Sequence, residues 1–300
     1  MKVLHIDAGH QMRGGQWQAL RLMEALAGLG VESTLLAPAG APLYELARRR
    51  GVRAEPLRLA RLARLGRRHD LVHAQDARSH TLGALTVGAP LVVSRRVAFA
   101  IGDSAASRWK YGRARRYIAV SEFVKAVLVE GGVEAERIDV VYDGVPLLEP
   151  AVPVEPPLIL APDNADDPRK GAAVAAEAGR LAGVEITFSG DLERDLRRAS
   201  VFVYVTESEG LGSAALLAMT AGVPVIASNV GGLKEVVAHE ESGLLVENQP
   251  GSIARAIRRL LDDRDAAARM GRHARRRVAE MFTIDNMARR TLDIYHRVLS

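Results

Sequence analysis

Residues 201–237 decide the fold, and they read VFVYVTESEGLGSAALLAMTAGVPVIASNVGGLKEVV. Val201–Val205 is a short apolar run that predicts a strand. A tight turn through Gly210–Gly212 follows, and Ser213 can cap the helix that comes after it. A second apolar run ends at Gly231–Gly232, where a second helix is expected to begin. The order strand, glycine turn, helix therefore occurs twice.

Both glycine turns lead into a helix N-terminus, where backbone N–H groups lack helical partners and the helix dipole is positive. Glycine also lets a ligand approach the backbone closely. We therefore expect this part of the chain to bind a phosphate, in particular a diphosphate.

This segment resembles the donor-binding half of the GT-B glycosyltransferases, specifically the retaining family 4, also called group 1. The strand, both glycine turns, Glu209, Glu235 and the closing Gly243–Val246 come in the order typical of that family. The resemblance covers nearly the whole chain, in shortened form. One position departs from the pattern, because the family has a second Glu eight residues after the first, and Leu217 stands there.

Strand-like apolar runs alternate with helical periodicity along the whole chain, which predicts parallel sheets with helices on both faces. The proline-rich stretch Val145–Pro157 predicts a linker. The resemblance implies an α/β fold of the GT-B type, with two Rossmann-like domains facing a cleft and a C-terminal helix that crosses back. We predict an acceptor-side domain over residues 1–148, a donor-binding domain over residues 149–284 and the crossing helix over residues 285–300.

Composition excludes several classes of protein. Three hundred residues, 48% of them apolar, can fill two cores. The chain has no cysteine, so it forms neither disulfides nor thiolate metal sites. The net charge is +5, but basic residues are scattered and aromatics make up only 4%, so nucleic acid is not an expected partner. No secretory leader is recognised and no run approaches the roughly 18 apolar residues of a membrane helix, so we expect a soluble, cytoplasmic protein.

Residues 57–68 read LRLARLARLGRR and alternate leucine with arginine. Such a helix could lie peripherally on an anionic membrane, at the inner face of the cytoplasmic membrane, where a lipid-linked acceptor would be found. An ordinary amphipathic surface helix has the same pattern.

Glu209 and Lys170 are the main candidates for chemistry. In the resembled family the acid at Glu209 contacts hydroxyls of the transferred sugar, and a Lys-Gly pair such as Lys170-Gly171 places an ammonium on the donor diphosphate. The alternative for Glu209 is an interaction with its own helix N-terminus, which favours negative charge. The alternative for Lys170 is solvation at the surface. The family's second cation falls at Ala165, so either it is missing or Arg169 substitutes for it.

A glycine pair between the first strand and a helix predicted over Trp17–Leu29 matches the family's first-domain glycine loop, which lies under the donor phosphates. The donor-binding residues that the resemblance implies are therefore Gly14, Gly15, Arg169, Gly210, Leu211, Gly212, Ser213, Gly231, Gly232 and Glu235.

In the first half of the chain, His73, Gln75 and His80 are acceptor-side candidates, although a lone histidine such as His73 is more often structural. Arg96 stands near the place of the family's catalytic-site histidine, and we count it among the catalytic candidates. An arginine can bind a sugar or phosphate through two hydrogen bonds, but it cannot act as a general base. No residue pattern typical of a metal site is found, and none is expected, because helix dipoles and cations can offset the charge of a leaving diphosphate.

We therefore predict a glycosyltransferase that moves a sugar from a nucleotide diphosphate-sugar to a hydroxyl acceptor, with retention and without a cofactor. By family habit, the acceptor is a cell-envelope glycan or glycolipid. Leu217, Arg96 and the missing cation leave open a non-catalytic protein that binds a sugar nucleotide or a partner. A sugar-nucleotide epimerase is a third possibility, for which the chain offers few acid–base groups.

Overall fold

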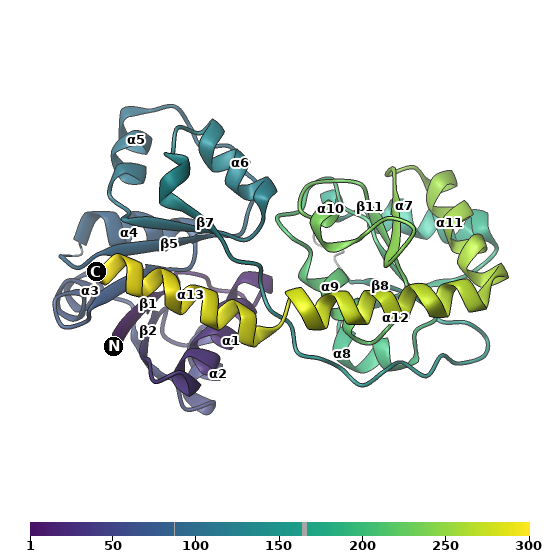
Figure 1. Cartoon of the computed structure of the whole chain (residues 1–300), viewed down its shortest axis with the longest axis horizontal. Coiled ribbons are helices and arrows are strands. Elements are labelled where there is room, and N and C mark those ends of the chain that lie inside the picture. The colour runs from purple at the N-terminus through teal and green to yellow at the C-terminus, as the bar shows by residue number, and fades with distance from the viewer. Residues whose placement is uncertain (87, 164–166) are drawn as a thin grey trace. The chain divides into compact units, whose positions relative to one another are not determined.

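The computed structural model describes residues 1–86, 88–163 and 167–300, so Ala165 lies outside the described part. The chain divides into two compact units. Unit 1 contains Met1–Gly144 together with Ile284–Ser300, and unit 2 contains Val145–Thr283. Both are α/β structures built on parallel sheets, which confirms the predicted fold class (Figure 1).

Unit 1 has a seven-stranded sheet in the order β3-β2-β1-β4-β5-β6-β7, and every pairing is parallel. Its strands are β1 (Lys2–Ile6), β2 (Glu32–Ala37), β3 (Arg53–Pro56), β4 (Leu71–Ala74), β5 (Leu91–Arg95), β6 (Arg116–Ala119) and β7 (Ile138–Val140). Its helices are α1 (Gly14–Gly28), α2 (Pro42–Arg49), α3 (Leu59–Gly66), α4 (Ala77–Thr86), α5 (Ala105–Gly112), α6 (Glu122–Glu130) and α13 (Ile284–Leu299).

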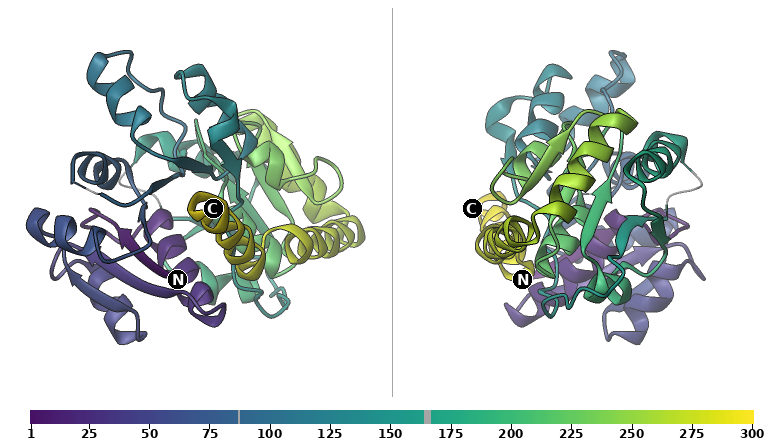
Figure 2. Two further views of the ribbon diagram at one scale, coloured as in Figure 1. Left: turned by 60° about the vertical axis from the view of Figure 1, so that its left-hand side comes forward. Right: turned by 90° about the vertical axis from the view of Figure 1, so that its right-hand side faces the viewer.

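Helices cover both faces of this sheet, as the two rotated views show (Figure 2). The central strand β1 is therefore buried on both sides from Val3 to Ile6. The last helix, α13, packs against α1 and contributes Met287, Ile294 and Tyr295 to the core of unit 1. Both termini of the chain consequently lie in unit 1 (Figure 1).

Unit 2 has a five-stranded parallel sheet in the order β12-β11-β10-β8-β9. Its strands are β8 (Ile159–Pro162), β9 (Ile186–Ser189), β10 (Val201–Tyr204), β11 (Val225–Ser228) and β12 (Gly243–Val246). Its helices are α7 (Ala172–Ala182), α8 (Leu192–Asp195), α9 (Ser213–Thr220), α10 (Leu233–Val236), α11 (Pro250–Asp262) and α12 (Arg264–Met281), with short 3-10 turns η2 (Pro168–Lys170) and η3 (Leu196–Arg198).

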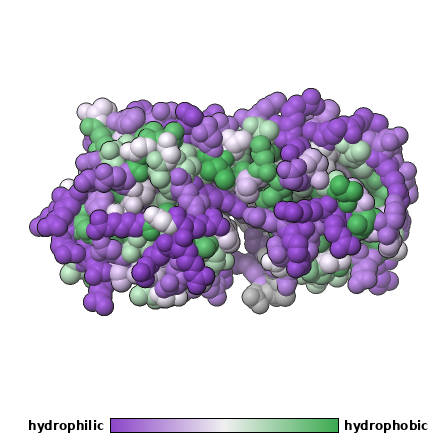
Figure 3. All heavy atoms as spheres, turned by 90° about the horizontal axis from the view of Figure 1, so that it is seen from below, coloured by the Kyte–Doolittle hydropathy of each residue, from purple (hydrophilic) through white to green (hydrophobic). Residues whose placement is uncertain are grey.

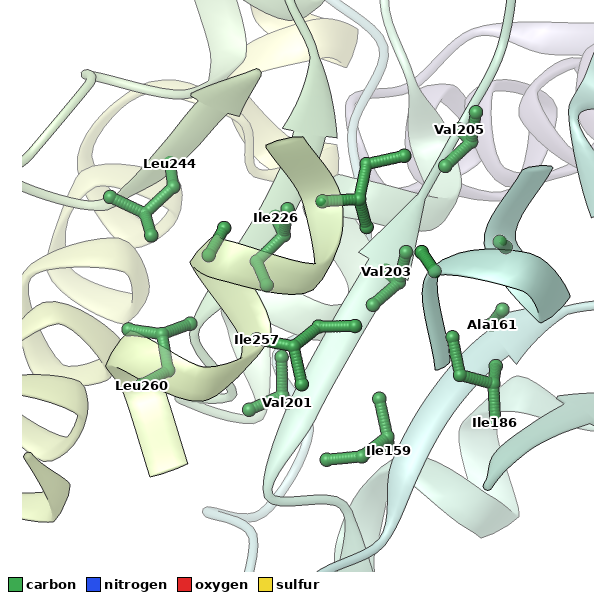
Figure 4. Close-up of a cluster of buried hydrophobic side chains, with 14 of the residues drawn as sticks. Ile159, Ala161, Ile186, Val201, Val203, Val205, Ile226, Leu244, Ile257 and Leu260 are labelled. Atoms are coloured by element: carbon green, nitrogen blue, oxygen red, sulfur yellow. The ribbon is translucent and has the colours of Figure 1, made fainter. Parts of the chain in front are cut away.

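Strand β10 shows why the sequence of unit 2 folds in this way. Val201, Val203 and Val205 alternate onto one face and join a core with residues from neighbouring elements, among them Ile226 and Ile257 (Figure 4). Because successive side chains of a strand point to opposite faces, Phe202 and Tyr204 lie on the other face, where their rings stack.

Two local predictions need correction. Helix α1 begins at Gly14, three residues before the predicted start, so Gly14 and Gly15 belong to its first turn and not to a preceding loop. Ser213 does not cap α9, because Gly212 occupies the cap position and Ser213 is the first helical residue. The glycine holds this position because its backbone angle φ is 110°, a conformation that other residues rarely adopt.

Each sheet has a switch point, where the chain changes the direction in which it adds strands. In unit 2 this point lies between β8 and β10, and in unit 1 it lies between β1 and β4. Ligands of open parallel sheets bind at the carboxyl ends of strands at such points. The topology therefore directs attention to the residues that follow β8 and β10, and to those that follow β1 and β4.

Candidate functional site

In unit 2, Lys170 and Glu209 meet at the switch point. Lys170 ends the turn η2 after β8, and Glu209 lies in the loop after the adjacent strand β10. The Lys170 Nζ donates to Glu209 Oε2 over 2.7 Å. Their side chains are 28% and 18% exposed, so the pair lies within reach of a ligand. The structure thus joins the two residues that the sequence singled out.

Two further donors hold the Glu209 carboxylate. The Tyr204 hydroxyl donates to the same Oε2 atom over 2.6 Å, and the Gly210 N–H donates to Oε1 over 3.2 Å. Tyr204 is 5% exposed, and its burial, followed by the charge and hydrogen bond of Glu209, raises the pKa of its hydroxyl well above the usual value. The hydroxyl therefore stays protonated and remains a donor.

The two glycine turns of unit 2 are packed directly against each other. The Gly232 N–H donates to the Glu209 carbonyl over 3.0 Å. A Cβ atom at Gly232 would come within 2.0 Å of the Gly210 carbonyl oxygen, and one at Gly212 would come within 2.5 Å of Leu233. Glycine is thus required at these positions for packing, in addition to any contact with a ligand.

Helices α7 and α9 both begin without a side-chain cap. Glycine occupies the cap position of each, Gly171 for α7 and Gly212 for α9, and both have positive φ. The first N–H groups of a helix have no helical acceptor, and a glycine at the cap position has no side chain that could accept from them. Together with Lys170, this arrangement favours an anion at the carboxyl ends of β8 and β10.

The other predicted donor residues occupy different environments. Leu211 is buried, Gly231 has positive φ, and Glu235 lies half-buried in α10. Arg169 is 59% exposed and forms an ion pair with Asp167 at 2.8 Å. Leu217 is buried in α9, so it packs inside unit 2 and offers no polar group.

In unit 1, Arg96 follows β5 and is held on two sides. Its Nε lies 3.1 Å from Asp143 Oδ1, and its Nη1 donates to the backbone and side-chain oxygens of Gln75. The Arg96 and Asp143 side chains are only 12% and 9% exposed. A Cβ atom at Gly15 would come within 3.8 Å of Arg96 Cδ, so the first turn of α1 lies beside this cluster.

A buried carboxyl group, Asp7, lies at the switch point of unit 1. It accepts hydrogen bonds from the Gly9 N–H at 2.8 Å and from the Gln16 amide. Burial and the nearby charge of Asp76 raise its pKa, while the hydrogen bonds from Gly9 and Gln16 and the charge of Arg96 oppose that rise. Asp76 in turn accepts from the Ala8 N–H and so ties the end of β1 to that of β4.

The predicted acceptor-side residues lie inside unit 1. Burial lowers the pKa of His73 well below its usual value, and both ring nitrogens are taken, by Tyr295 at 2.6 Å and by Ser94 at 2.8 Å. Burial, then the Lys110 charge, lowers the pKa of His80 to about 3. Gln75 is bonded to His5 and Arg96. The assignment of His73 and His80 to acceptor contact does not fit this burial, because neither ring reaches the surface.

Helix α3, in the leucine–arginine stretch, turns much of its apolar face inward. Leu62 and Leu65 are buried, whereas Leu59 is 57% exposed. Arg61 pairs with Glu55 and so also turns toward the protein. The face of the molecule in Figure 3 is mainly hydrophilic, with hydrophobic residues in separate patches. Among the described helices, none is both long and apolar enough to cross a bilayer.

Sequence reasoning missed Tyr204, Asp7 and the ion-pair role of Asp143. A tyrosine inside an apolar strand looks like a core residue, and Asp143 looks like part of a turn. Within the described ranges no cluster of three or more His, Asp or Glu side chains could hold a metal ion.

Two family models match the chain. The model for glycosyl transferases group 1 matches residues 174–277, and the model for glycosyltransferase family 4 matches residues 12–148. Among curated relatives, D-inositol 3-phosphate glycosyltransferase of Streptomyces avermitilis is 44% identical over 100 residues, which is 33% of this chain and 21% of that protein. Alpha-maltose-1-phosphate synthase of Mycolicibacterium smegmatis is 34% identical over 156 residues, 47% of this chain and 40% of that protein. The matched segments thus span less than half of these relatives.

Solved structures match over nearly the whole chain. The HepE protein of Anabaena, in complex with UDP and glucose, has a TM-score of 0.87 at 16% identity and covers 99% of this chain and 100% of its own. Sucrose-phosphate synthase from Thermosynechococcus elongatus has a TM-score of 0.79 at 22% identity and covers 99% and 98%. At such identity these likenesses establish the fold alone.

The fold and the matches define the class as the GT-B glycosyltransferases. Within that class, both halves of the chain resemble group 1, family 4, as the two family models show.

Proposed function

We propose that the protein transfers a sugar from a nucleotide diphosphate-sugar to a hydroxyl acceptor. The observation that carries this proposal is the partly exposed Lys170–Glu209 pair at the switch point of unit 2, beside two helices with glycine caps. HepE, which shares the fold, is known in complex with UDP and UDP-glucose, so UDP-sugars are the first donors to test.

In this reaction the bond between the anomeric carbon and the leaving diphosphate breaks, and a bond from the acceptor oxygen forms. The acceptor oxygen bonds on the face that the diphosphate leaves and gives its proton to a phosphate oxygen of that leaving group, so the anomeric configuration is retained. Lys170 and the N–H groups of α7 and α9 offset the charge that develops on the diphosphate. Glu209 accepts hydrogen bonds from sugar hydroxyls. No cofactor takes part.

Unit 1 is assigned to the acceptor, which we propose is a cell-envelope glycan or glycolipid. Arg96 is fixed by Asp143 and Gln75, so its remaining N–H groups are preorganised for an oxygen-rich ligand. Contact with an anionic membrane would rest on Leu59, Arg58 and Arg64 of the α3 region, which are exposed. Co-sedimentation with vesicles containing phosphatidylglycerol tests this contact, and wild-type binding equal to that of Arg58→Glu/Arg64→Glu would refute it.

The first test is thermal unfolding in the presence of UDP-, GDP-, ADP- and dTDP-linked sugars. A nucleotide at 100 times its dissociation constant stabilises the folded protein by about 2.7 kcal/mol. We expect a shift with one nucleotide class, a reduced shift in Glu209→Ala and an unchanged shift in Glu207→Ala, an exposed neighbour. The responding donor then enters a transfer assay, in which the anomeric configuration of the product reports retention.

A second candidate is a protein that binds a sugar nucleotide without turnover. It is favoured by Leu217, because this buried leucine replaces the acid that holds the nucleotide ribose in the resembled family. Stabilisation by a nucleotide sugar with no release of nucleotide, across a panel of glycan and glycolipid acceptors, would favour this candidate over transfer. Absence of any stabilisation would remove the donor site altogether.

A further inference from the structure

We propose that Tyr204 is a positioning residue, which holds the Glu209 carboxylate in place for the sugar when the donor diphosphate draws Lys170 away. This inference rests on the proposed function and adds a division of labour among the three side chains. Lys170 binds the phosphates and Glu209 binds the sugar. Tyr204 keeps Glu209 oriented after Lys170 has moved to the phosphates.

The contacts lead to this view because one carboxylate oxygen receives both donors. Lys170 Nζ and the Tyr204 hydroxyl both point to Glu209 Oε2, at 2.7 and 2.6 Å. A diphosphate carries more negative charge than one carboxylate, so it competes successfully for the Lys170 ammonium. Glu209 then loses its counter-ion and keeps only the Tyr204 hydroxyl and the Gly210 N–H among the donors described here.

Tyr204 is suited to this task because it cannot follow Lys170. Its ring is buried, stacks on Phe202 and passes close to the Gly212 turn, where a Cβ atom would lie 3.6 Å from Tyr204 Cε1. The Lys170 ammonium, by contrast, lies at the end of a long, partly exposed side chain. A fixed neutral donor orients the carboxylate and leaves its charge available to sugar hydroxyls.

Tyr204→Phe provides a sharp test, because it removes one hydroxyl and keeps the ring in the core. The dissociation constants of UDP and UDP-glucose are measured for the full chain, or those of whichever nucleotide pair stabilises the wild type. We expect the affinity for the nucleotide diphosphate to stay within about twofold. The extra affinity for the nucleotide sugar, and kcat/KM, should fall about 10- to 100-fold, as for a lost hydrogen bond to a charged group.

Lys170→Met, which retains Tyr204, should have the opposite effect to that of Tyr204→Phe. It should weaken binding of the nucleotide diphosphate while the ratio between nucleotide and nucleotide-sugar affinities stays close to that of the wild type. In a Glu209→Gln background, Tyr204→Phe should have little additional effect, because the charged acceptor is already gone. Tyr117→Phe, which removes a buried hydroxyl bonded to the Tyr111 carbonyl in unit 1, is the matched control.

Two results would overturn the proposal. One is an equal loss of nucleotide and nucleotide-sugar affinity in Tyr204→Phe, which would mean that the hydroxyl only stabilises the fold. The other is loss of the sugar-specific ratio in Lys170→Met, which would mean that Lys170 orients Glu209. A wild-type chain that binds no nucleotide at all would refute the proposed function itself, and this outcome is distinguishable because it precedes any variant.

Discussion

The two units each carry a cation–carboxylate pair near the carboxyl edge of a parallel sheet. In unit 2, Lys170 and Glu209 are 28% and 18% exposed, and both belong to loops that follow neighbouring strands. In unit 1, Arg96 and Asp143 are 12% and 9% exposed, and Gln75 also binds the arginine. The pair in unit 1 is therefore less exposed and more firmly tied to its surroundings than the pair in unit 2.

Individual helix N-termini in the two units also differ in how they are capped. In unit 1, Ser121 caps α6 through a hydrogen bond from the Val124 N–H at 3.0 Å. In unit 2, α7 and α9 have glycine at the cap position. A side-chain cap accepts from an N–H group of the first turn, whereas glycine has no side chain with which to do so. The contrast holds for these particular helices, since α8 and α12 of unit 2 are capped by the Asp191 and Asp263 side chains.

The largest expected effect is on catalysis in unit 2. Lys170→Met should lower kcat/KM for transfer by about 10²- to 10³-fold, because it removes a charge aimed at the leaving diphosphate. The free energy of unfolding should fall by less than about 1 kcal/mol, since the pair is partly exposed. Steady-state kinetics and urea unfolding measure the two effects. A large loss of stability with normal kinetics in Lys170→Met would contradict the expected difference between the Lys170–Glu209 and Arg96–Asp143 pairs.

Arg96 should contribute more to the free energy of unfolding than Lys170 does. Arg96→Met leaves Asp143 nearly buried without its cation, and we expect a loss of about 3 kcal/mol in the free energy of unfolding. Adding Asp143→Asn should recover much of this loss, because the unpaired charge is then gone. Trp17 and Trp109, the two tryptophans of the chain, both lie in unit 1, so tryptophan fluorescence follows its unfolding. A double variant no more stable than Arg96→Met would contradict the argument.

The difference between the Lys170–Glu209 and Arg96–Asp143 pairs also shows which parts of the fold and site local sequence patterns can predict. The parallel sheets, the glycine turns, and Glu209 with Lys170 are predictable, because each pattern is short and lies at the end of a strand. Arg96 is different, since its partners Gln75 and Asp143 are 21 and 47 residues away. No local pattern marks such a cluster, so the histidines near Gln75 attract attention although they are buried. Tyr204 escapes notice because its ring is a core residue and only its hydroxyl belongs to the site.

Acid should act first on unit 1. Burial lowers the pKa values of His5 and His80 to about 3, and that of His73 well below the usual value, so the unfolded chain binds protons that the folded unit does not. Stability is therefore complete above about pH 6.5 and falls below it, by about 1.4 kcal/mol per pH unit for each such histidine. Asp7 acts in the opposite sense, because its raised pKa makes the folded state bind a proton more readily.

Urea unfolding between pH 7 and pH 4, followed by tryptophan fluorescence for unit 1 and by circular dichroism for the whole chain, measures this dependence. As the pH is lowered, we expect the urea midpoint measured by fluorescence to decrease before the midpoint of the rest of the transition measured by circular dichroism. His80→Gln should reduce the slope with pH by about one proton, because the buried imidazole that stays neutral in the folded state is gone. An equal slope in wild type and His80→Gln would refute the assignment.

The smallest expected effect concerns the helix caps. Ser121→Ala removes the hydrogen bond to the Val124 N–H and should cost about 1 kcal/mol in the stability of unit 1. Nucleotide affinity should not change, because the proposed donor site involves α7 and α9 and not the capped N–H groups of α6. Glu130→Ala, at the exposed far end of the same helix, is the control and should cost less than about 0.5 kcal/mol. A change in nucleotide affinity with Ser121→Ala would contradict the proposal that the nucleotide binds at the glycine-capped helices α7 and α9.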